Sequence, residues 1–363
     1  MGDRTIEQGA QDFGGGEGVR FTCEGAVGVV TLCRPDALNA LSHEMIGALT
    51  RALLVWADDP AISAVLVEGE GRAFCAGEDL IEIYRESRAG RPPVSYFADE
   101  YRLGALISRY PKPVISFVDG IVMGGGVGLA FHGSHRVMTE NGVFAMPQVG
   151  VGFFPDVGGT CILSGVKGSF GMYLALTGER TRWGDALWTQ LATHAVLQED
   201  LPELREALIA TADPDQALRA VAMVPPRETD DAALHLIATH FSRDTLDHVL
   251  ASLRQAAARG DEFSRRTLRV ILSRSPTSVA VTFAQITAGT MLTVEEALRM
   301  EFRILNRMLE GHDFFEGIRA TLIKRDRHPR WKPARMEDVD PLAVEAHFAS
   351  LGERELVLWG ERR

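Results

Sequence analysis

Residues 113–131 read PVISFVDGIVMGGGVGLAF and contain the features that decide the fold. The β-branched run 113–118 is typical of a buried strand, and the apolar run 127–131 indicates the start of a helix. Three consecutive glycines, at 124–126, stand directly before that helix. Backbone amides at such a turn are unpaired and partly positive, so they can bind an anion or a developing oxyanion.

Two earlier segments repeat the strand-then-helix pattern. The runs 27–33 (VGVVTLC) and 62–67 (ISAVLV) predict short buried strands. Ser42 is a candidate N-cap for a following helix with apolar residues at helical spacing, and a second helical pattern covers 98–107. Strands that alternate with helices favour an α/β fold with largely parallel strands.

The 36 glycines, about a tenth of the 363 residues, exceed the usual share of about 7 %. They gather in three clusters after predicted strands, at 69–77, 119–128 and 150–159. Glycine lets the backbone approach a ligand closely or adopt positive φ. We interpret the three clusters as parts of one shared ligand site, although any single cluster is equally consistent with a tight turn.

The hydrophobic pattern of the sequence changes near residue 197, after which patterns typical of helices replace those typical of strands. Val294, Leu298, Leu305 and Leu309 fall on one face of a helix that runs through Glu310. We therefore expect a disordered tail over 1–18, a core over 19–196 that holds the site, and a helical region over 197–363 that completes the fold. The other helical stretches are expected at 204–211, 232–241, 246–258 and 263–273.

Composition excludes several classes of function. The chain carries 38 basic and 49 acidic residues, a net charge of −11, which argues against nucleic-acid and anionic-membrane partners. No apolar run reaches about 18 residues, and residues 1–20 resemble neither a signal nor a transit peptide. No cysteine pair has metal-site spacing, so we expect no metal site and reduced thiols in a cytoplasmic protein. The cysteines are Cys23, Cys33, Cys75 and Cys161.

Familiar catalytic motifs are missing, which leaves chemistry based on backbone amides. The sequence has no phosphate-binding G-x-x-x-x-G-K-[ST] loop, no G-x-S-x-G elbow and no H-E-x-x-H. A second turn, residues 74–79 (FCAGED), also leads from a strand toward a predicted helix at 80–84. Amides from the two turns could converge on one carbonyl oxygen and form an oxyanion hole without side chains.

Three segments carry a resemblance to a known superfamily. They are RAFCAGEDL at 72–80, DGIVMGGGVGLA at 119–130 and FAMPQVGVGFFPDVGG at 144–159. This pattern resembles the crotonase (enoyl-CoA hydratase/isomerase) superfamily, whose members bind acyl-CoA thioesters and stabilise an enolate or tetrahedral oxyanion with two backbone amides. The segment 310–333 (EGHDFFEGIRATLIKRDRHPRWKP) resembles the longer 3-hydroxyisobutyryl-CoA hydrolase branch. The implied fold is a crotonase-like spiral of ββα units with a mostly helical C-terminal region.

The resemblance assigns roles to individual residues. It places the oxyanion-hole amides at Glu78 and Gly125, and a catalytic aspartate at Asp156. A hydratase carries a glutamate where this chain has Gly128, and the hydrolase branch carries a glutamate where this chain has Gln148. The hydrolase branch also has a glycine at the position of Glu78, and we expect the Glu78 side chain to point away from the site.

The amide at position 148 changes the chemistry that can be expected. Gln148 can neither attack as a carboxylate nor act as a general base near neutral pH, but it can orient water or hold a substrate hydroxyl. The chain is therefore impaired as a hydrolase, or Asp156 does the base work alone. Without the motif around it, Asp156 could equally be a helix cap.

The remaining expectations concern the substrate. The resemblance implies that Phe315 and Lys324 lie near CoA, and Arg34 and Arg72 are candidate phosphate partners. The predicted substrate-binding set is completed by Ala73, Ala76, Gly77 and Gly124. CoA is expected only as part of the substrate, with no permanently bound cofactor, and the protein is expected to form a homo-oligomer.

We interpret the chain as an acyl-CoA thioester enzyme of the crotonase fold. The preferred activity is hydrolysis of a short branched 3-hydroxyacyl-CoA, which would place the protein in valine catabolism or fatty acid metabolism. Two alternatives stay open: an enoyl-CoA hydratase/isomerase, and a catalytically impaired homologue that binds acyl-CoA because Gln148 replaces the expected glutamate.

Overall fold

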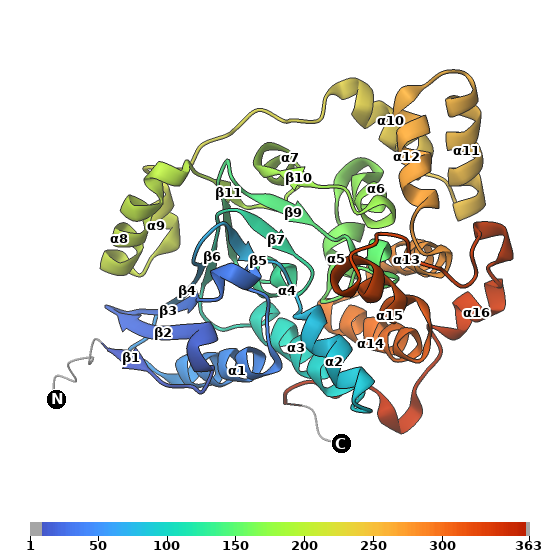
Figure 1. The fold of residues 1–363 in the computed structure, drawn as a ribbon. Helices are drawn as coiled ribbons and strands as arrows, with labels where there is room; N and C mark the ends of the chain where they lie inside the picture. The colour runs from blue at the N-terminus through green and yellow to red at the C-terminus, as the bar shows by residue number, and fades with distance from the viewer. Residues whose placement is uncertain (1–8, 361–363) are drawn as a thin grey trace, which may run out of the picture. The chain divides into compact units, whose positions relative to one another are not determined.

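In the computed structural model, which describes residues 9–360, seven strands form one main sheet (Figure 1). The strands β3, β4, β6, β8 and β11 pair in parallel, whereas β1 and β2 are antiparallel at one edge. The prediction of an α/β fold with largely parallel strands is thereby confirmed. In sheet order the strands are β1 (Ala10–Gln11), β2 (Val19–Glu24), β3 (Val27–Leu32), β4 (Ala64–Gly69), β6 (Val114–Val118), β8 (His135–Met138) and β11 (His194–Ala195).

The edge of this sheet includes part of the expected N-terminal tail. Strand β1 pairs with β2, and the Phe13 ring packs edge-on against Phe21 and Trp56 at centroid distances of 5.2 and 5.8 Å. Burial of these rings favours a fixed position. Residues 10–11 therefore belong to the sheet and Phe13 packs against it, where we expected a disordered tail. Residues 1–8 of the expected tail lie outside the described part of the chain.

Helices cover both faces of the main sheet. On one face, Val27 and Val29 belong to a buried cluster with Leu204 and Leu208 of α8 (Leu201–Thr211) and with residues of α9 (Pro214–Leu218). On the other face, Gly28 lies so close to Trp56 of α1 (His43–Asp58) that a Cβ there would be 2.6 Å from the indole ring. The predicted cap of α1 is confirmed, because the Ser42 hydroxyl accepts from the Met45 amide at 3.2 Å.

A second sheet, absent from our sequence prediction, carries the glycine turns. Its order is β10-β9-β7-β5, and β5 and β7 run in parallel. The helix α4 begins directly after β7. The elements are β5 (Ala73–Cys75), β7 (Ile121–Met123), α4 (Gly125–Phe131), β9 (Val143–Ala145), β10 (Thr181–Arg182) and α7 (Trp183–Trp188), and α3 (Val94–Ser108) precedes β6 in the chain.

The chain divides into two compact units in a different way from the linear division at 196/197 that we expected. Successive segments of the first two thirds of the chain belong alternately to one unit and the other. Residues 197–228 cover the main sheet instead of joining the C-terminal helices. The sheet unit comprises Met1–Asp79, Asp99–Phe144 and Thr181–Glu228, and the helical unit comprises Leu80–Ala98, Ala145–Arg180 and Thr229–Arg363.

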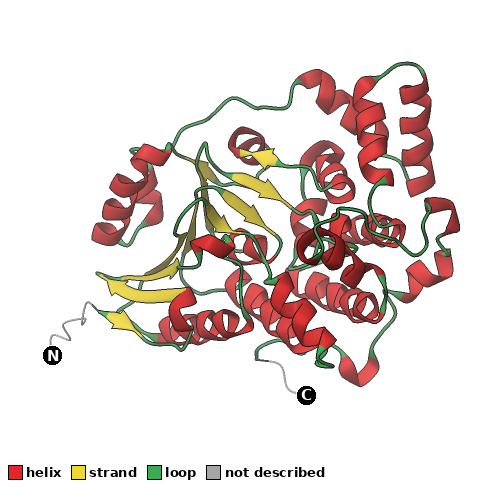
Figure 2. Ribbon diagram, viewed as in Figure 1, coloured by secondary structure: helices red, strands yellow, loops and turns green. Residues whose placement is uncertain are grey.

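Up to residue 360, the helical unit consists of helices and loops (Figure 2), apart from Ala145 at the end of β9. The Tyr173 ring of α6 contacts the rings of Phe241 and Phe263 at centroid distances of 5.4 and 5.9 Å. The predicted helices after residue 229 are confirmed. They belong to the set α2 (Leu80–Arg88), α5 (Gly159–Ser164), α6 (Phe170–Thr177), α10 (Asp231–Phe241), α11 (Leu246–Ala258), α12 (Glu262–Leu272), α13 (Pro276–Ala288), α14 (Val294–Glu310), α15 (Asp313–Ile318) and α16 (Pro341–Ala346). Within residues 9–360, none of the helices combines the length and apolar character needed to cross a bilayer.

Candidate active site

Two backbone turns of the sheet unit lie against each other. Because β5 and β7 are parallel, the turns that follow them leave from the same edge of the sheet. The first turn is held by Leu41, whose amide donates to the Gly77 carbonyl at 2.8 Å and whose carbonyl accepts from the Asp79 amide at 3.0 Å. A Cβ on Gly77 would lie 3.0 Å from the amide nitrogen of Gly125. The two predicted turns therefore come together.

Each glycine of the triplet has its own structural reason. Gly124 adopts a φ of 53°, in the left-handed region that favours glycine. A Cβ on Gly125 would lie 2.1 Å from Oε1 of Glu100, and a Cβ on Gly126 would lie 2.3 Å from the carbonyl oxygen of Cys75. The triplet thus allows the start of α4 to pack directly on the end of β5 and beside a carboxylate.

The Glu78 side chain points into this turn pair, so our expectation that it points away is wrong. A Cβ on Gly124 would lie 2.6 Å from Oε2 of Glu78. Burial raises the pKa of the Glu78 carboxyl, and hydrogen bonds from the amides of Glu78 and Gly125 oppose part of this rise. These two amides stabilise the inward orientation of the carboxylate through hydrogen bonds. They are also the two amides predicted for the oxyanion hole, so both act on one group.

Sequence reasoning missed a second carboxylate beside Gly125. Glu100 lies in α3 and is only 4 % exposed. Its neighbours Phe97 and Tyr101 are buried as well. The available signal was an acidic residue between two aromatic residues on an apolar stretch of helix, but nothing in the sequence indicated that this stretch faces Gly125.

The cysteines behave as expected. All four are free thiols. The Cys75 thiol, next to the turn pair, is fully buried and donates to the Asn39 carbonyl at 3.1 Å. Burial raises its pKa well above the usual range, so the thiolate is strongly disfavoured. Cys75 is therefore a packing residue and not a nucleophile.

In the helical unit, the structure brings the predicted pair Gln148 and Asp156 together. Asp156 is fully buried, Gln148 is 5 % exposed, and Nε2 of Gln148 donates to Oδ1 of Asp156 at 3.2 Å. In the described part of the chain, Oε1 of Gln148 is buried and has no hydrogen-bond partner. The N-cap of the following helix α5 is Gly158, so Asp156 is not its cap. Asp156 is therefore a buried carboxyl group, and Oε1 of the adjacent Gln148 is available to accept a hydrogen bond.

Two buried residues hold the turn that carries Asp156. The Glu301 carboxylate accepts from the Gly158 amide at 2.7 Å, the Thr160 amide at 2.9 Å and the Thr160 hydroxyl at 2.6 Å. Nε2 of Gln285 donates to the Pro155 carbonyl at 2.6 Å. The spacing of Leu298, Glu301 and Leu305 in α14 places the acid on the apolar face, a signal that sequence reasoning did not use.

Glu301→Gln is expected to change how stability depends on pH. Burial raises the pKa of the Glu301 carboxyl to about 7, despite the hydrogen bonds from Thr160 and Gly158. The folded state therefore binds the proton more tightly than the unfolded chain. As a result, Glu301 makes the free energy of unfolding fall by about 3 kcal/mol as pH rises from about 4.5 to 7.

Glutamine does not titrate, so the variant should lose this slope when unfolding by denaturant is measured at several pH values. Glu228→Gln is the matched control, because Glu228 also accepts from two backbone amides, those of Gly184 and Asp185. An unchanged slope in Glu301→Gln would contradict the prediction.

The residues predicted to contact CoA differ in burial and in whether their side chains are already bonded within the protein. The Arg34 guanidinium bonds Asp79 at 2.9 Å and the Ala40 carbonyl at 2.6 Å, so it holds the turn instead of standing open for a phosphate. Arg72 is exposed, whereas Ala73 is buried in β5. The other predicted positions are Ala76, half-buried in the turn; Phe315, half-buried with its ring 5.3 Å from that of Phe314; and Lys324, exposed at the end of a helical turn.

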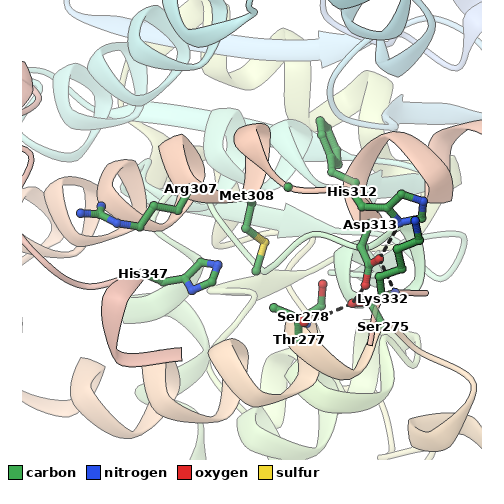
Figure 3. A pocket seen from close by; sticks show the side chains of 12 residues that line it. Ser275, Thr277, Ser278, Arg307, Met308, His312, Asp313, Lys332 and His347 are labelled. Atoms are coloured by element: carbon green, nitrogen blue, oxygen red, sulfur yellow. Dashed lines mark hydrogen bonds and ion pairs between the residues drawn. The ribbon is translucent and has the colours of Figure 1, made fainter. Parts of the chain in front are cut away.

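A cavity of about 180 Å³ lies in the helical unit (Figure 3). Asp313 lies at its wall, where it accepts from the Ser275 hydroxyl at 2.6 Å and the Lys332 amide at 2.8 Å. Phe314 lines this cavity, but Phe315 and Lys324 do not. The cavity is therefore not formed by the residues that the sequence predicted near CoA.

Comparisons with known proteins decide the family. The family described as Enoyl-CoA hydratase/isomerase matches residues 27–348. The chain belongs to this enoyl-CoA hydratase/isomerase family. The resemblance and the crotonase-like fold predicted from the three motif segments are confirmed.

Relatives of this family member carry different names. The 3-hydroxyisobutyryl-CoA hydrolase, mitochondrial, of Rattus norvegicus is 40 % identical over 344 residues, 92 % of this chain and 89 % of the relative. The protein of the same name from Homo sapiens is 38 % identical over 94 % of this chain and 90 % of the relative. A solved carnitinyl-CoA dehydratase from Mycobacterium thermoresistibile matches with TM-score 0.89 and 40 % identity, over 95 % of this chain and all of that chain. A solved enoyl-CoA hydratase from Rhodobacter sphaeroides 2.4.1 matches with TM-score 0.85 and 34 % identity, over 94 % of this chain and 100 % of that chain.

Proposed function

We propose that this family member hydrolyses the CoA thioester of a short branched 3-hydroxy acid. The amides of Glu78 and Gly125 bind the thioester carbonyl oxygen and stabilise the tetrahedral oxyanion. Curated relatives about 40 % identical over nine tenths of the chain are named 3-hydroxyisobutyryl-CoA hydrolase, which supports this substrate class.

The observation that carries the proposal is the buried Gln148–Asp156 pair. Oε1 of Gln148, without a partner in the described chain, can accept from a substrate hydroxyl or from the attacking water. Asp156 carries a proton in the reaction, either from the water or to the departing thiolate. Water adds its oxygen to the carbonyl carbon, the C–S bond breaks, and the products are a carboxylic acid and free CoA thiol.

Position 128 favours hydrolysis over hydration. A hydratase of this family needs a glutamate in α4 at this position, and Gly128 is buried and has no side chain to carry a proton. The hydratase/isomerase alternative keeps support from the solved relatives named carnitinyl-CoA dehydratase and enoyl-CoA hydratase. In that case the same amides would hold an enolate, and no free thiol would appear.

Gln148→Glu is expected to raise the rate of thiol release. A carboxylate at position 148 adds a general base, and such a group contributes typically about 10²–10⁴-fold. Both the unmodified protein and the variant should be assayed on a panel of acyl-CoA esters with a thiol reagent, including 3-hydroxyisobutyryl-CoA and crotonyl-CoA.

Absence of thiol release by both proteins from every branched 3-hydroxyacyl-CoA would overturn the hydrolase proposal. Thermal stabilisation by these esters without turnover of any would instead support the impaired, acyl-CoA-binding alternative. Hydration of crotonyl-CoA without thiol release would support the hydratase.

We also propose the cofactor requirement, the pathway, the assembly and the location of the protein. CoA is part of the substrate, and we propose that no cofactor stays bound. A place in valine catabolism fits the proposed ester, and a homo-oligomer is proposed as for other members of the family. We propose a cytoplasmic location, although the curated relatives are named as mitochondrial proteins.

A further inference from the structure

We propose that Glu78 is a catalytic residue of this protein, a general base that takes the proton of the water attacking the thioester carbon. This inference rests on the proposed hydrolase function and extends it. It assigns the base to a side chain that also contributes its backbone amide to the oxyanion hole.

The first observation is where the Glu78 carboxylate lies. It accepts from the amides of Glu78 and Gly125, the two donors proposed for the thioester oxygen. The distance of 2.6 Å from Oε2 to an added Cβ on Gly124 confirms that the carboxylate sits against the glycine triplet. The resting protein thus holds its own carboxylate where the substrate oxygen is to bind.

The second observation is that this carboxylate is not consumed by a structural ion pair. Nearby Arg34 bonds the neighbouring Asp79 at 2.9 Å. Among residues 9–360, Oε1 of Glu78 is buried without a hydrogen-bond partner. A buried carboxylate oxygen that lacks a donor is costly to maintain for structure alone, and it is well suited to accept a proton from a bound water.

The Glu78 carboxylate stays within reach of the thioester carbon during the reaction. When the carbonyl oxygen displaces the carboxylate from the amides, the carboxylate remains tethered to the residue whose amide holds that oxygen. It therefore cannot leave the neighbourhood of the carbonyl carbon. Burial also raises the pKa of the Glu78 carboxyl, so its ionised form is a stronger base than an exposed carboxylate.

The resulting reaction balances. The water oxygen bonds to the carbonyl carbon while one water proton passes to the Glu78 carboxylate, and the oxyanion is held by the two amides. The tetrahedral intermediate collapses, the C–S bond breaks, and the departing thiolate takes a proton from Asp156. A proton then passes from Glu78 to Asp156 through solvent, which completes the cycle.

The test compares Glu78→Gln and Glu78→Gly with the unmodified protein by thiol release from 3-hydroxyisobutyryl-CoA. Both variants keep the backbone amide, and both should lose about 10²–10⁴-fold in kcat. Added formate should restore part of the activity of Glu78→Gly, because a small carboxylate fits the space left by the side chain. It should not restore Glu78→Gln, whose side chain fills that space. Glu86→Gln is the matched control, since Glu86 lies in α2, pairs with Arg91 and has a side chain that is 41 % exposed.

The outcomes separate the inference from the proposed function. Equal or faster turnover by Glu78→Gly would show that the carboxylate only obstructs the hole and would overturn the inference while the hydrolase stands. Loss of activity in both variants with no rescue by formate would also count against a base role. An unmodified protein that releases no thiol from any ester would overturn the proposed function and the inference with it.

Discussion

Asp156→Asn is expected to lower kcat for thioester hydrolysis by about 10²–10⁴-fold, the usual contribution of a positioned proton carrier. Asparagine has nearly the same shape, and its side-chain oxygen can still accept from Nε2 of Gln148, which lies 3.2 Å from Oδ1 in the native protein. Glu301 and Gln285 also hold the turn, through the Gly158 amide and the Pro155 carbonyl. The variant therefore removes the ionisable group and leaves these two contacts of the turn in place.

The measurement is steady-state thiol release together with the thermal midpoint of unfolding. Asp340→Asn is the matched control, because Asp340 caps α16 through the Leu342 amide and asparagine caps helices equally well. The control should keep full activity. A fully active Asp156→Asn protein would show that Asp156 moves no proton, and unfolding of the variant at room temperature would show that its role is structural.

Gly126→Ala is expected to lower kcat/KM by about 10²–10³-fold, comparable to the loss of one oxyanion-hole donor. The added Cβ would lie 2.3 Å from the Cys75 carbonyl oxygen and 2.8 Å from the Cys75 Cβ, so the start of α4 has to move away from β5. That movement carries the neighbouring Gly125 amide away from the Glu78 turn. A displacement of this kind separates two donors that must reach one oxygen.

Gly104→Ala in α3 is the matched control for this substitution. Its added Cβ would meet Cδ2 of His132 at 3.5 Å, an ordinary van der Waals distance, and alanine favours a helix. Thiol release and far-ultraviolet circular dichroism should be measured for both variants. Unchanged activity of Gly126→Ala would show that the position of the Gly125 amide does not limit catalysis.

Much of the site follows from local sequence. Strands 27–32, 64–69 and 114–118 were recognisable because consecutive β-branched residues favour a buried strand over a helix. The glycine triplet predicts a close approach of the backbone to another group. In the structure these groups are the Glu100 carboxylate and the Cys75 carbonyl. Gln148 and Asp156 were paired correctly by their motif, since they lie on one short stretch of chain.

Other features could not be read from local sequence, because they depend on partners far away in the chain. Glu301 meets Gly158 and Thr160 across more than 140 residues, so no nearby pattern identifies its partners. Strand β1 and the second sheet were missed because two- and three-residue strands carry little periodicity.

The sequence by itself determined the family, the alternation of strand and helix, and the backbone amides available for an oxyanion. The tertiary structure alone decided the direction of Glu78 and the burial of Glu100. A side chain's direction is set by the donors and the space around it, and here the amide of Gly125 and the space beside Gly124 come from a turn more than 40 residues later in the chain. That long-range contact placed a carboxylate, which we expected to face away, at the two amides proposed for the oxyanion hole.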